Sequence, residues 1–204
     1  ALLGCKDGDG NYFIVDEHVQ KSWIPERHAS AIKAMLDRHN VTPTKPMQNP
    51  EPSDIPMMQY TLVRNASGLH ELRRIESQDR SLSRFVAGTD VFSKQSNGST
   101  IANEYINFGI RFTPANTERV SGWAQILNRL GDPDAGIPPK LFIHERCRRL
   151  LECIPALQHD PNQPEDVLKV DVDEDGAGGD DTADALRYMI ATKPRIIYEC
   201  KLTS

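Results

Sequence analysis

Cysteine is scarce in this chain, and its spacing argues against a sulfur-ligated metal. The 204 residues include four cysteines, at positions 5, 147, 153 and 200, and no two of them form a C-x-x-C pair. Structural zinc sites use such closely spaced thiols, and small secreted domains depend on a dense set of disulfides. The sequence therefore predicts free thiols in a reducing compartment and no zinc site.

A long apolar run and a positive net charge are also missing. A transmembrane helix needs about 20 apolar residues, and no stretch here comes near that length. The net charge is −5, whereas a protein that merely coats DNA has a broad positive surface. A nuclease stays compatible with this charge, because metal-binding carboxylates are negative and a basic groove can lie elsewhere. We expect a soluble protein with its own core and no membrane partner.

Several common catalytic motifs are absent as well. The chain has no G-x-x-x-x-G-K-[ST] loop for a nucleoside triphosphate and no G-x-S-x-G nucleophile turn. Its six histidines, at positions 18, 28, 39, 70, 144 and 159, show no H-x-x-x-H spacing. The sequence thus gives no support for P-loop nucleotide hydrolysis, serine hydrolysis or a histidine-ligated metal.

The chain does contain an alternation of strand and helix patterns. Two apolar stretches around turn residues 7–10 predict a β-hairpin that ends near residue 19. Periodicity and end residues predict the other elements, with strands at 60–63, 84–90, 110–112 and 141–143 and helices at 25–40, 69–79, 99–108, 120–130, 145–157 and 181–191. This order predicts an α/β fold with a mixed central β-sheet flanked by α-helices.

The proline-rich stretch 42–59 interrupts that alternation, because each proline removes a backbone donor. We interpret 42–80 as an insertion or extended loop within a single domain that spans 1–204. The alternative is a disordered loop without a role.

Asp90 is the first candidate site residue. It follows an apolar stretch and precedes a polar loop, and ligands collect beyond the carboxyl ends of strands in open α/β sheets. A turn or capping aspartate is the alternative interpretation.

The second candidate is the cluster of Asp180, Asp181 and Asp184. Helical spacing places residues three or four apart on one face. A helix N-terminus stabilises acids, so Asp180 could be only a cap. Three clustered carboxylates repel one another unless a cation offsets them, and oxygen-only ligands suit Mg²⁺ or Mn²⁺.

A competing calcium motif lies just upstream. Residues 171–176 match the first half of an EF-hand loop, D-x-D-x-D-G. The twelfth position, which should be glutamate, is Thr182, and Pro161 and Pro164 interrupt any incoming helix. We interpret this stretch as a solvated acidic loop.

Six short motifs occur in a fixed order over the second half of the chain: NGSTIA at 97–102, FTPAN at 112–116, RVSGW at 119–123, IPALQHD at 154–160, PEDV at 164–167 and DALRY at 184–188. In this respect the stretch from Asp90 to Tyr188 resembles the nuclease domain of the large terminase subunits of tailed bacteriophages. The resemblance implies an RNase H-like fold and an acidic site for two Mg²⁺ or Mn²⁺ ions.

The resemblance also assigns the site residues. The family's middle-strand acid falls on Asp90, and its C-terminal acids fall among Asp180, Asp181 and Asp184, of which we favour Asp181 and Asp184. The family places another metal-binding aspartate in its first strand, ahead of the position that matches Ala1. We therefore expect a fragment that starts just after that residue, with weak or no activity of its own. Candidate phosphate contacts are Lys94, Arg119 and Arg187.

The implied activity is metal-dependent endonucleolytic cleavage of concatemeric double-stranded viral DNA during packaging, with little sequence specificity. The implied partners are duplex DNA, the terminase ATPase domain, the small terminase subunit and the portal protein, in the cytoplasm of an infected bacterium. Two alternatives stay open. One is a non-catalytic module that docks on the portal or small subunit, and the other is a related RNase H-like resolvase acting on branched DNA.

Overall fold

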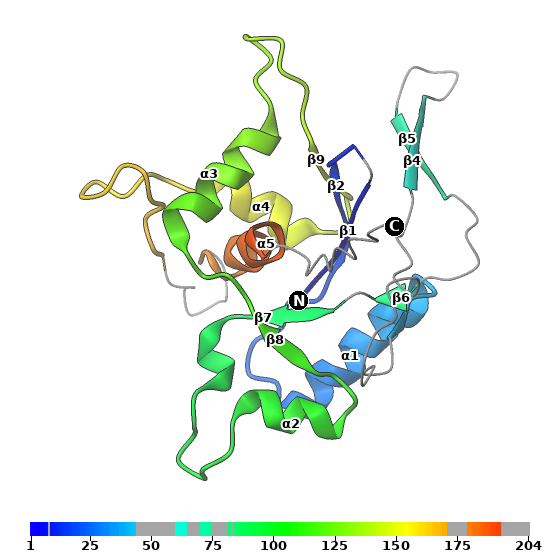
Figure 1. Ribbon diagram of the computed structural model, residues 1–204, viewed down its shortest axis with the longest axis vertical. Coiled ribbons are helices and arrows are strands. Elements are labelled where there is room, and N and C mark those ends of the chain that lie inside the picture. Colours follow the sequence, from blue (N-terminus) through cyan, green and yellow to red (C-terminus); the bar gives the residue numbers. More distant parts are fainter. Residues whose placement is uncertain are drawn as a thin grey trace, which may run out of the picture.

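The computed structural model describes residues 1–7, 9–43, 60–64, 70–74, 81–82, 84–170 and 179–192. In chain order, its elements are β1 (Leu2–Lys6), β2 (Tyr12–Glu17), α1 (Pro25–Arg38), β3 (Thr42–Pro43), β4 (Tyr60–Arg64), β5 (His70–Arg74), β6 (Ser81–Leu82), β7 (Phe85–Ala87), the 3-10 helix η1 (Thr89–Phe92), α2 (Ile101–Asn107), β8 (Phe112–Pro114), α3 (Arg119–Leu130), β9 (Leu141–Ile143), α4 (Arg148–Ala156) and α5 (Asp181–Ala191) (Figure 1).

Strands β1, β2 and β9 form the central sheet, with β2 in the middle. β1 and β2 run antiparallel and pair Lys6 with Tyr12, while β2 and β9 run parallel and pair Tyr12 with Leu141. The hairpin turn is held by Asp7, whose carboxylate accepts a hydrogen bond from the backbone N–H of Asn11 at 2.8 Å. The predicted mixed α/β architecture is therefore confirmed, although this sheet is small.

Helices cover both faces of the central sheet, which gives three layers. Alternate side chains of a strand point to opposite faces, and β2 follows this rule. Ile14 packs into a buried cluster with residues of α3, α4 and α5, whereas Phe13 and Val15 belong to a second cluster with residues of α1. Helix α5 contacts both α3 and α4 as well as β1, and Figure 1 shows the three helices on the same side of the sheet.

A smaller parallel pair, β7 and β8, extends the α1 side of the molecule. It pairs Phe85 with Phe112, and α1 and α2 pack against both rings through Ile32 and Tyr105. Strand β7 also contacts α5. The chain after β7, which contains Asp90, is thereby brought to the helix that begins with the acidic cluster.

Strand β2 also fixes the start of α4. The carboxylate of Glu17 accepts hydrogen bonds from the backbone N–H groups of Arg149 at 2.7 Å and Leu150 at 3.1 Å. Two free donors of the first helical turn are thus satisfied by a residue far away in sequence. The helix therefore starts at Arg148, whereas the sequence predicts a start at residue 145.

Two sequence predictions are wrong. The segment predicted as a charged helix at 69–79 contains strand β5, which pairs antiparallel with β4 and sets Leu72 opposite Leu62. Pairing with a neighbouring strand outweighs a modest local helix propensity. The strand predicted over 84–90 ends at Ala87, and Asp90 lies in η1.

Two predicted segments lie partly outside the described residues: 44–59 of the proline-rich insertion, and 171–178, which hold the EF-hand-like motif. Among the described residues, no helix combines the length and apolar character needed to cross a lipid bilayer.

Candidate functional site

Asp180 lies at the N-cap position of α5, but its side chain makes no capping hydrogen bond. The residue is 4% exposed, and its Oδ2 atom is buried without a hydrogen-bond partner. Burial raises the pKa of this carboxyl above its usual value, and the negative charge of Asp184 raises it further. A simple helix cap therefore does not account for Asp180, because a capping aspartate is hydrogen-bonded to the first turn.

Asp184 lies one turn later on the same helix and is held by two arginines. Arg187 donates from Nε to its Oδ1 at 3.0 Å, with Nη2 at 2.9 Å from the same oxygen. Arg119, from the start of α3, places Nη1 3.9 Å from Asp184 Oδ2 and 4.0 Å from Asp180 Oδ2. Asp180 and Asp184 thus share one cationic neighbour.

Arg119 is itself anchored by a third acid. Its Nε donates to Asp166 Oδ2 at 2.8 Å, and its Nη2 donates to the carbonyl oxygen of Val167 at 2.8 Å. The hydrogen bond to Asp166 raises the pKa of Arg119. Burial alone would raise the pKa of Asp166, but the hydrogen bonds from Arg119 and Val167 lower it. This geometry fixes the guanidinium beside the acids of α5.

Arg187 joins α5 to the entry of α3. Its side chain is among the most buried in the described part of the chain, at 1% exposure. Nη1 donates to the carbonyl oxygens of Thr117 at 2.9 Å and Glu118 at 3.2 Å. A Cβ on Gly122 would lie 2.6 Å from Arg187 Cγ, so glycine is needed for this close approach. With its side chain buried and its donors so engaged, Arg187 links α5 to the entry of α3.

Asp90 approaches α5 through Gly88 and Tyr188. A Cβ built on Gly88 would lie 2.6 Å from Asp90 Oδ1 and 3.2 Å from Tyr188 Cε2. The pKa of Tyr188 is raised, chiefly by burial and then by the charges of Asp184 and Asp90. Tyr188 therefore lies within electrostatic reach of both acids, which are far apart in sequence.

The other predicted site residues lie apart from this arrangement. Asp181 is exposed at the start of α5, and among the described residues no hydrogen bond or ion pair joins its side chain to the Arg119 network. Lys94 is also exposed, in the loop that follows η1, where its backbone bridges to Thr100. The structure brings Asp180 and Asp184 together beside Arg119 and places Asp90 and Tyr188 beside Gly88, although the sequence argument favoured Asp181.

The acids at the start of α5 meet some of the requirements of a site for a divalent cation, but not all of them. Their oxygens are the hard ligands that Mg²⁺ and Mn²⁺ prefer, and the unpartnered Oδ2 of Asp180 is a buried acceptor awaiting a donor or a cation. Within the described ranges, however, no three His, Cys, Asp or Glu side chains converge as a metal-binding group. Asp180 and Asp184 form one pair, which Arg119 and Arg187 partly neutralise.

Sequence reasoning did not single out Gly88 or Asp166. Gly88 immediately precedes the Thr-Asp pair of η1, and a glycine beside a candidate site acid is a usable sign of close packing. Asp166 belongs to the PEDV motif at 164–167. Its hydrogen bond with Arg119 joins residues 47 positions apart, and no local sequence pattern indicates such a contact.

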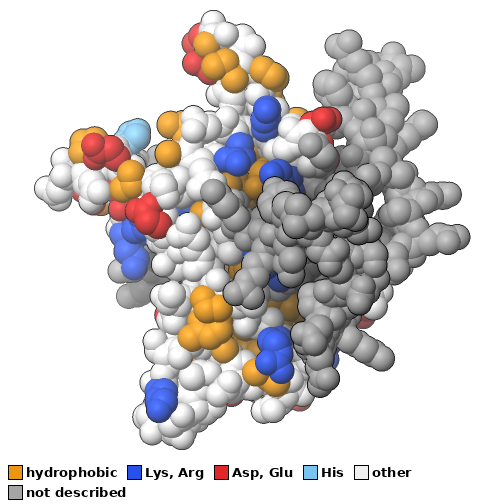
Figure 2. All heavy atoms as spheres, viewed as in Figure 1, with side chains coloured by type: hydrophobic (Ala, Val, Ile, Leu, Met, Phe, Trp, Pro, Cys, Tyr) orange, Lys and Arg blue, Asp and Glu red, His pale blue; other side chains and the backbone are white. Residues whose placement is uncertain are grey.

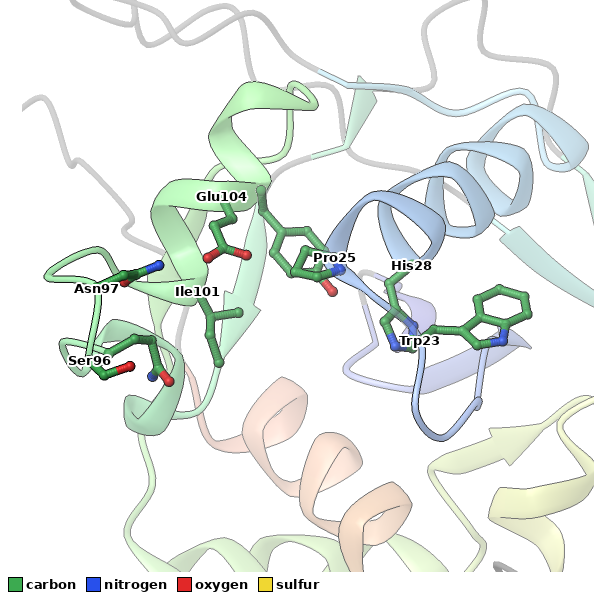
Figure 3. Close-up of a pocket in the computed structure, with 9 residues that line it drawn as sticks. Trp23, Pro25, His28, Ser96, Asn97, Ile101 and Glu104 are labelled. Carbon is green, nitrogen blue, oxygen red and sulfur yellow. The ribbon is translucent and has the colours of Figure 1, made fainter.

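A separate cavity of about 510 Å³ opens between the start of α1, α2 and the loop that follows η1. Figure 3 shows Trp23 and His28 on one side of it and Ser96, Asn97 and Glu104 on the other. His28 Nδ1 lies 3.0 Å from the imidazole of His18. None of the predicted site residues lines this cavity.

Comparison of the chain with family models, with curated proteins and with solved structures gives no match.

Proposed function

We propose that this chain is the nuclease domain of a viral DNA-packaging terminase and cleaves double-stranded DNA with divalent metal ions. The observation that supports this best is the approach of Asp90 to α5, where the charges of Asp90 and Asp184 both act on Tyr188. The proposed site comprises Asp90 with Asp180, Asp181 and Asp184. Within the α/β class, we propose that the domain has an RNase H-like fold.

In this proposal, the site aspartates bind the metal ions, and Arg119 and Arg187 keep the aspartates of α5 in position. Mg²⁺ or Mn²⁺, when bound, supplies a lower pKa for an attacking water and neutralises charge on the phosphodiester. Asp184 is oriented by Arg187, and Asp180 keeps a free oxygen for ligation. Arg119 offsets the repulsion between these two carboxylates while the cation is absent.

The proposed substrate is double-stranded DNA, which the protein would bind through the phosphate groups of the DNA backbone. Cleavage with little sequence specificity is expected when a protein contacts the backbone and not the base edges. Lys94 is exposed and available for such a contact. Arg119 is half-buried and already bonded to Asp166, so it acts on the site acids. The terminase ATPase domain, the small subunit, the portal and a bacterial host cytoplasm are part of the same proposal.

The test is cleavage of supercoiled plasmid with Mn²⁺, with Mg²⁺ and with EDTA. It is run on this chain and on the complete product of its gene, each with an Asp90→Asn variant. We expect nicking that needs the metal and falls by at least about a hundredfold in the variant, since loss of a metal ligand removes transition-state charge stabilisation.

Asp134→Asn is the matched control, because Asp134 is an exposed acid in the loop before β9. It should cut at the wild-type rate. The nuclease proposal would be overturned if the folded, complete gene product failed to cut the plasmid with either Mn²⁺ or Mg²⁺. It would also be overturned if the Asp90→Asn variant were as active as the control.

One observation favours a non-catalytic interaction module. Arg119 and Arg187 already compensate much of the negative charge of the α5 acids, as in a purely structural ion-pair network. Such a module would keep its binding to a terminase partner in the Asp90→Asn variant and would show no cleavage in either form. A resolvase would instead cut branched DNA in preference to linear duplex.

A further inference from the structure

Two cationic side chains lie over the Tyr12 ring at one end of the central sheet, and the backbone of a third basic residue is hydrogen-bonded to Tyr12. Lys6 Nζ lies 5.4 Å from the centre of the Tyr12 ring, and the guanidinium carbon of Arg129 lies 4.9 Å from it. Lys140 immediately precedes β9, and its carbonyl oxygen accepts the backbone N–H of Tyr12 at 2.7 Å. We name Lys6, Tyr12, Arg129 and Lys140 the Tyr12 surface.

Backbone contacts fix the positions of all four residues. Lys6 is the registered partner of Tyr12 across the β1–β2 hairpin. Lys140 donates its backbone N–H to the carbonyl oxygen of Arg129 at 2.7 Å. The backbones of β1 and of the segment before β9 therefore flank Tyr12 on both sides of β2, with neighbouring strands about 5 Å apart.

Among the cations of this surface, Arg129 makes one internal hydrogen bond, from Nη1 to the carbonyl oxygen of Gln125 at 2.5 Å. Lys6 and Lys140 are exposed and Arg129 is half-buried, and none of the three takes part in an ion pair among the described residues. Figure 2 shows Lys and Arg side chains gathered on this face between α3 and the β1–β2 hairpin. The net charge of the chain is −5, so this group of positive side chains is a local departure from an overall negative protein.

The acids closest in sequence to these cations accept hydrogen bonds within the turns to which they belong. Asp7 accepts hydrogen bonds from Asn11 through backbone N–H at 2.8 Å and side-chain amide at 2.7 Å. Asp132 accepts from the backbone N–H groups of Asp134 at 3.0 Å and Ala135 at 3.1 Å. Asp9 is an exposed turn residue that lies beyond ion-pair distance of the three cations.

We infer that the Tyr12 surface binds the phosphate backbone of DNA, at a place distinct from the acids of α5. Fixed cations offset phosphate charge, and the Tyr12 ring holds Lys6 and Arg129 beside it through cation–π contacts. The choice of DNA over another polyanion rests on the proposed nuclease function. The surface would hold the DNA while the acidic site cuts it.

The test is equilibrium binding of a fluorescent 30-base-pair duplex, measured by anisotropy in EDTA so that cleavage cannot interfere. The variant is Lys6→Gln/Arg129→Gln/Lys140→Gln. The control is Lys33→Gln/Arg111→Gln/Arg148→Gln, which removes the same charge from exposed residues elsewhere. Circular dichroism checks that both are folded.

We expect the Tyr12-surface variant to bind at least about tenfold more weakly at 0.1 M salt, and the slope of log K against log salt to fall by about 2–3, since each lost phosphate contact removes about 0.9. The control should stay within about twofold of the wild type. Equal weakening of both variants, or none in the first, would overturn the inference.

Polyglutamate at the same salt is the comparison ligand, and wild-type binding to it as tight as to DNA would overturn the nucleic-acid assignment. The Asp90→Asn variant should bind duplex as the wild type does. Loss of cleavage with binding intact therefore reports on the acidic site, and loss of binding reports on the Tyr12 surface.

Discussion

Asp180 combines features that rarely occur together in a residue at a helix start. Its carboxylate is buried, carries an oxygen without a hydrogen-bond partner, and lies beside a second acid of the same helix. Such a group is costly when ionised, because water no longer solvates the charge. A cation would remove that cost, so we expect the stability of the protein to depend on pH and, if the proposed metal binds, on the metal as well.

The first prediction concerns Asp180→Asn in metal-free buffer. Burial raises the folded-state pKa of Asp180 above that of an ordinary aspartate, so the folded protein binds this proton more tightly than the unfolded chain does. Stability is therefore lost as the pH rises through the folded pKa. We expect the variant to be more stable than the wild type at pH 7 by about 1 kcal/mol, and equal to it near the unfolded pKa.

Urea denaturation in EDTA at a series of pH values measures this difference. Asp134→Asn, at an exposed position, should show no such pH dependence. A variant that is less stable than the wild type at pH 7 would show that Asp180 is a stabilising ion-pair partner of Arg119 and not a strained acceptor.

Gly88 tests the positioning of Asp90. Its φ of −57° is open to alanine, so Gly88→Ala strains no backbone, but the added Cβ would meet Asp90 Oδ1 at 2.6 Å. The short carboxylate can turn aside at little cost in stability. We expect Gly88→Ala to lower the nicking rate by about tenfold or more, because small misplacements of catalytic groups are costly. Nicking at the wild-type rate would show that the Asp90 position is irrelevant.

At the scale of elements, α3 and α5 depend on Arg187. This side chain joins Asp184 of α5 to the carbonyl oxygens that precede α3 and packs against Gly122. Arg187→Met should lower the free energy of unfolding by about 3 kcal/mol, because it leaves one member of a buried pair uncompensated. Urea denaturation measures the loss.

Arg148→Met is the matched control, since Arg148 is exposed at the start of α4. It should change the unfolding free energy by no more than about 0.5 kcal/mol. Equal effects of the two substitutions would mean that Arg187 does not join the helices.

Helix α5 has the residue range that the sequence predicts, and α1, α2 and α3 are found within a few residues of their predicted ranges. These helices have a periodic apolar face and clear end residues, which are local properties. The start of α4 and the strand at His70–Arg74 were mispredicted because they depend on Glu17 and on pairing with β4. Such long-range partners leave no mark in a local window.

At the scale of the molecule, the sequence predicted the mixed α/β architecture and the acids around which the candidate site forms. It did not predict which side chains face one another. Asp180, and not Asp181, is buried beside Asp184, and Asp166 reaches Arg119 across the fold. Helical spacing gives the face of a residue, but the packing of α3 against α5 decides which acid is covered.

The proposed function depends on one property, the binding of a divalent cation by Asp90 and the α5 acids. Titration of Mn²⁺ into the complete gene product, followed by the electron paramagnetic resonance of free Mn²⁺, measures it directly. We predict saturable binding that weakens by about tenfold or more in Asp90→Asn and in Asp184→Asn, because each removes a charged oxygen ligand, and that is unchanged in Asp134→Asn. Equal Mn²⁺ binding by all four proteins, or none by the wild type, would contradict the proposed metal-dependent nuclease.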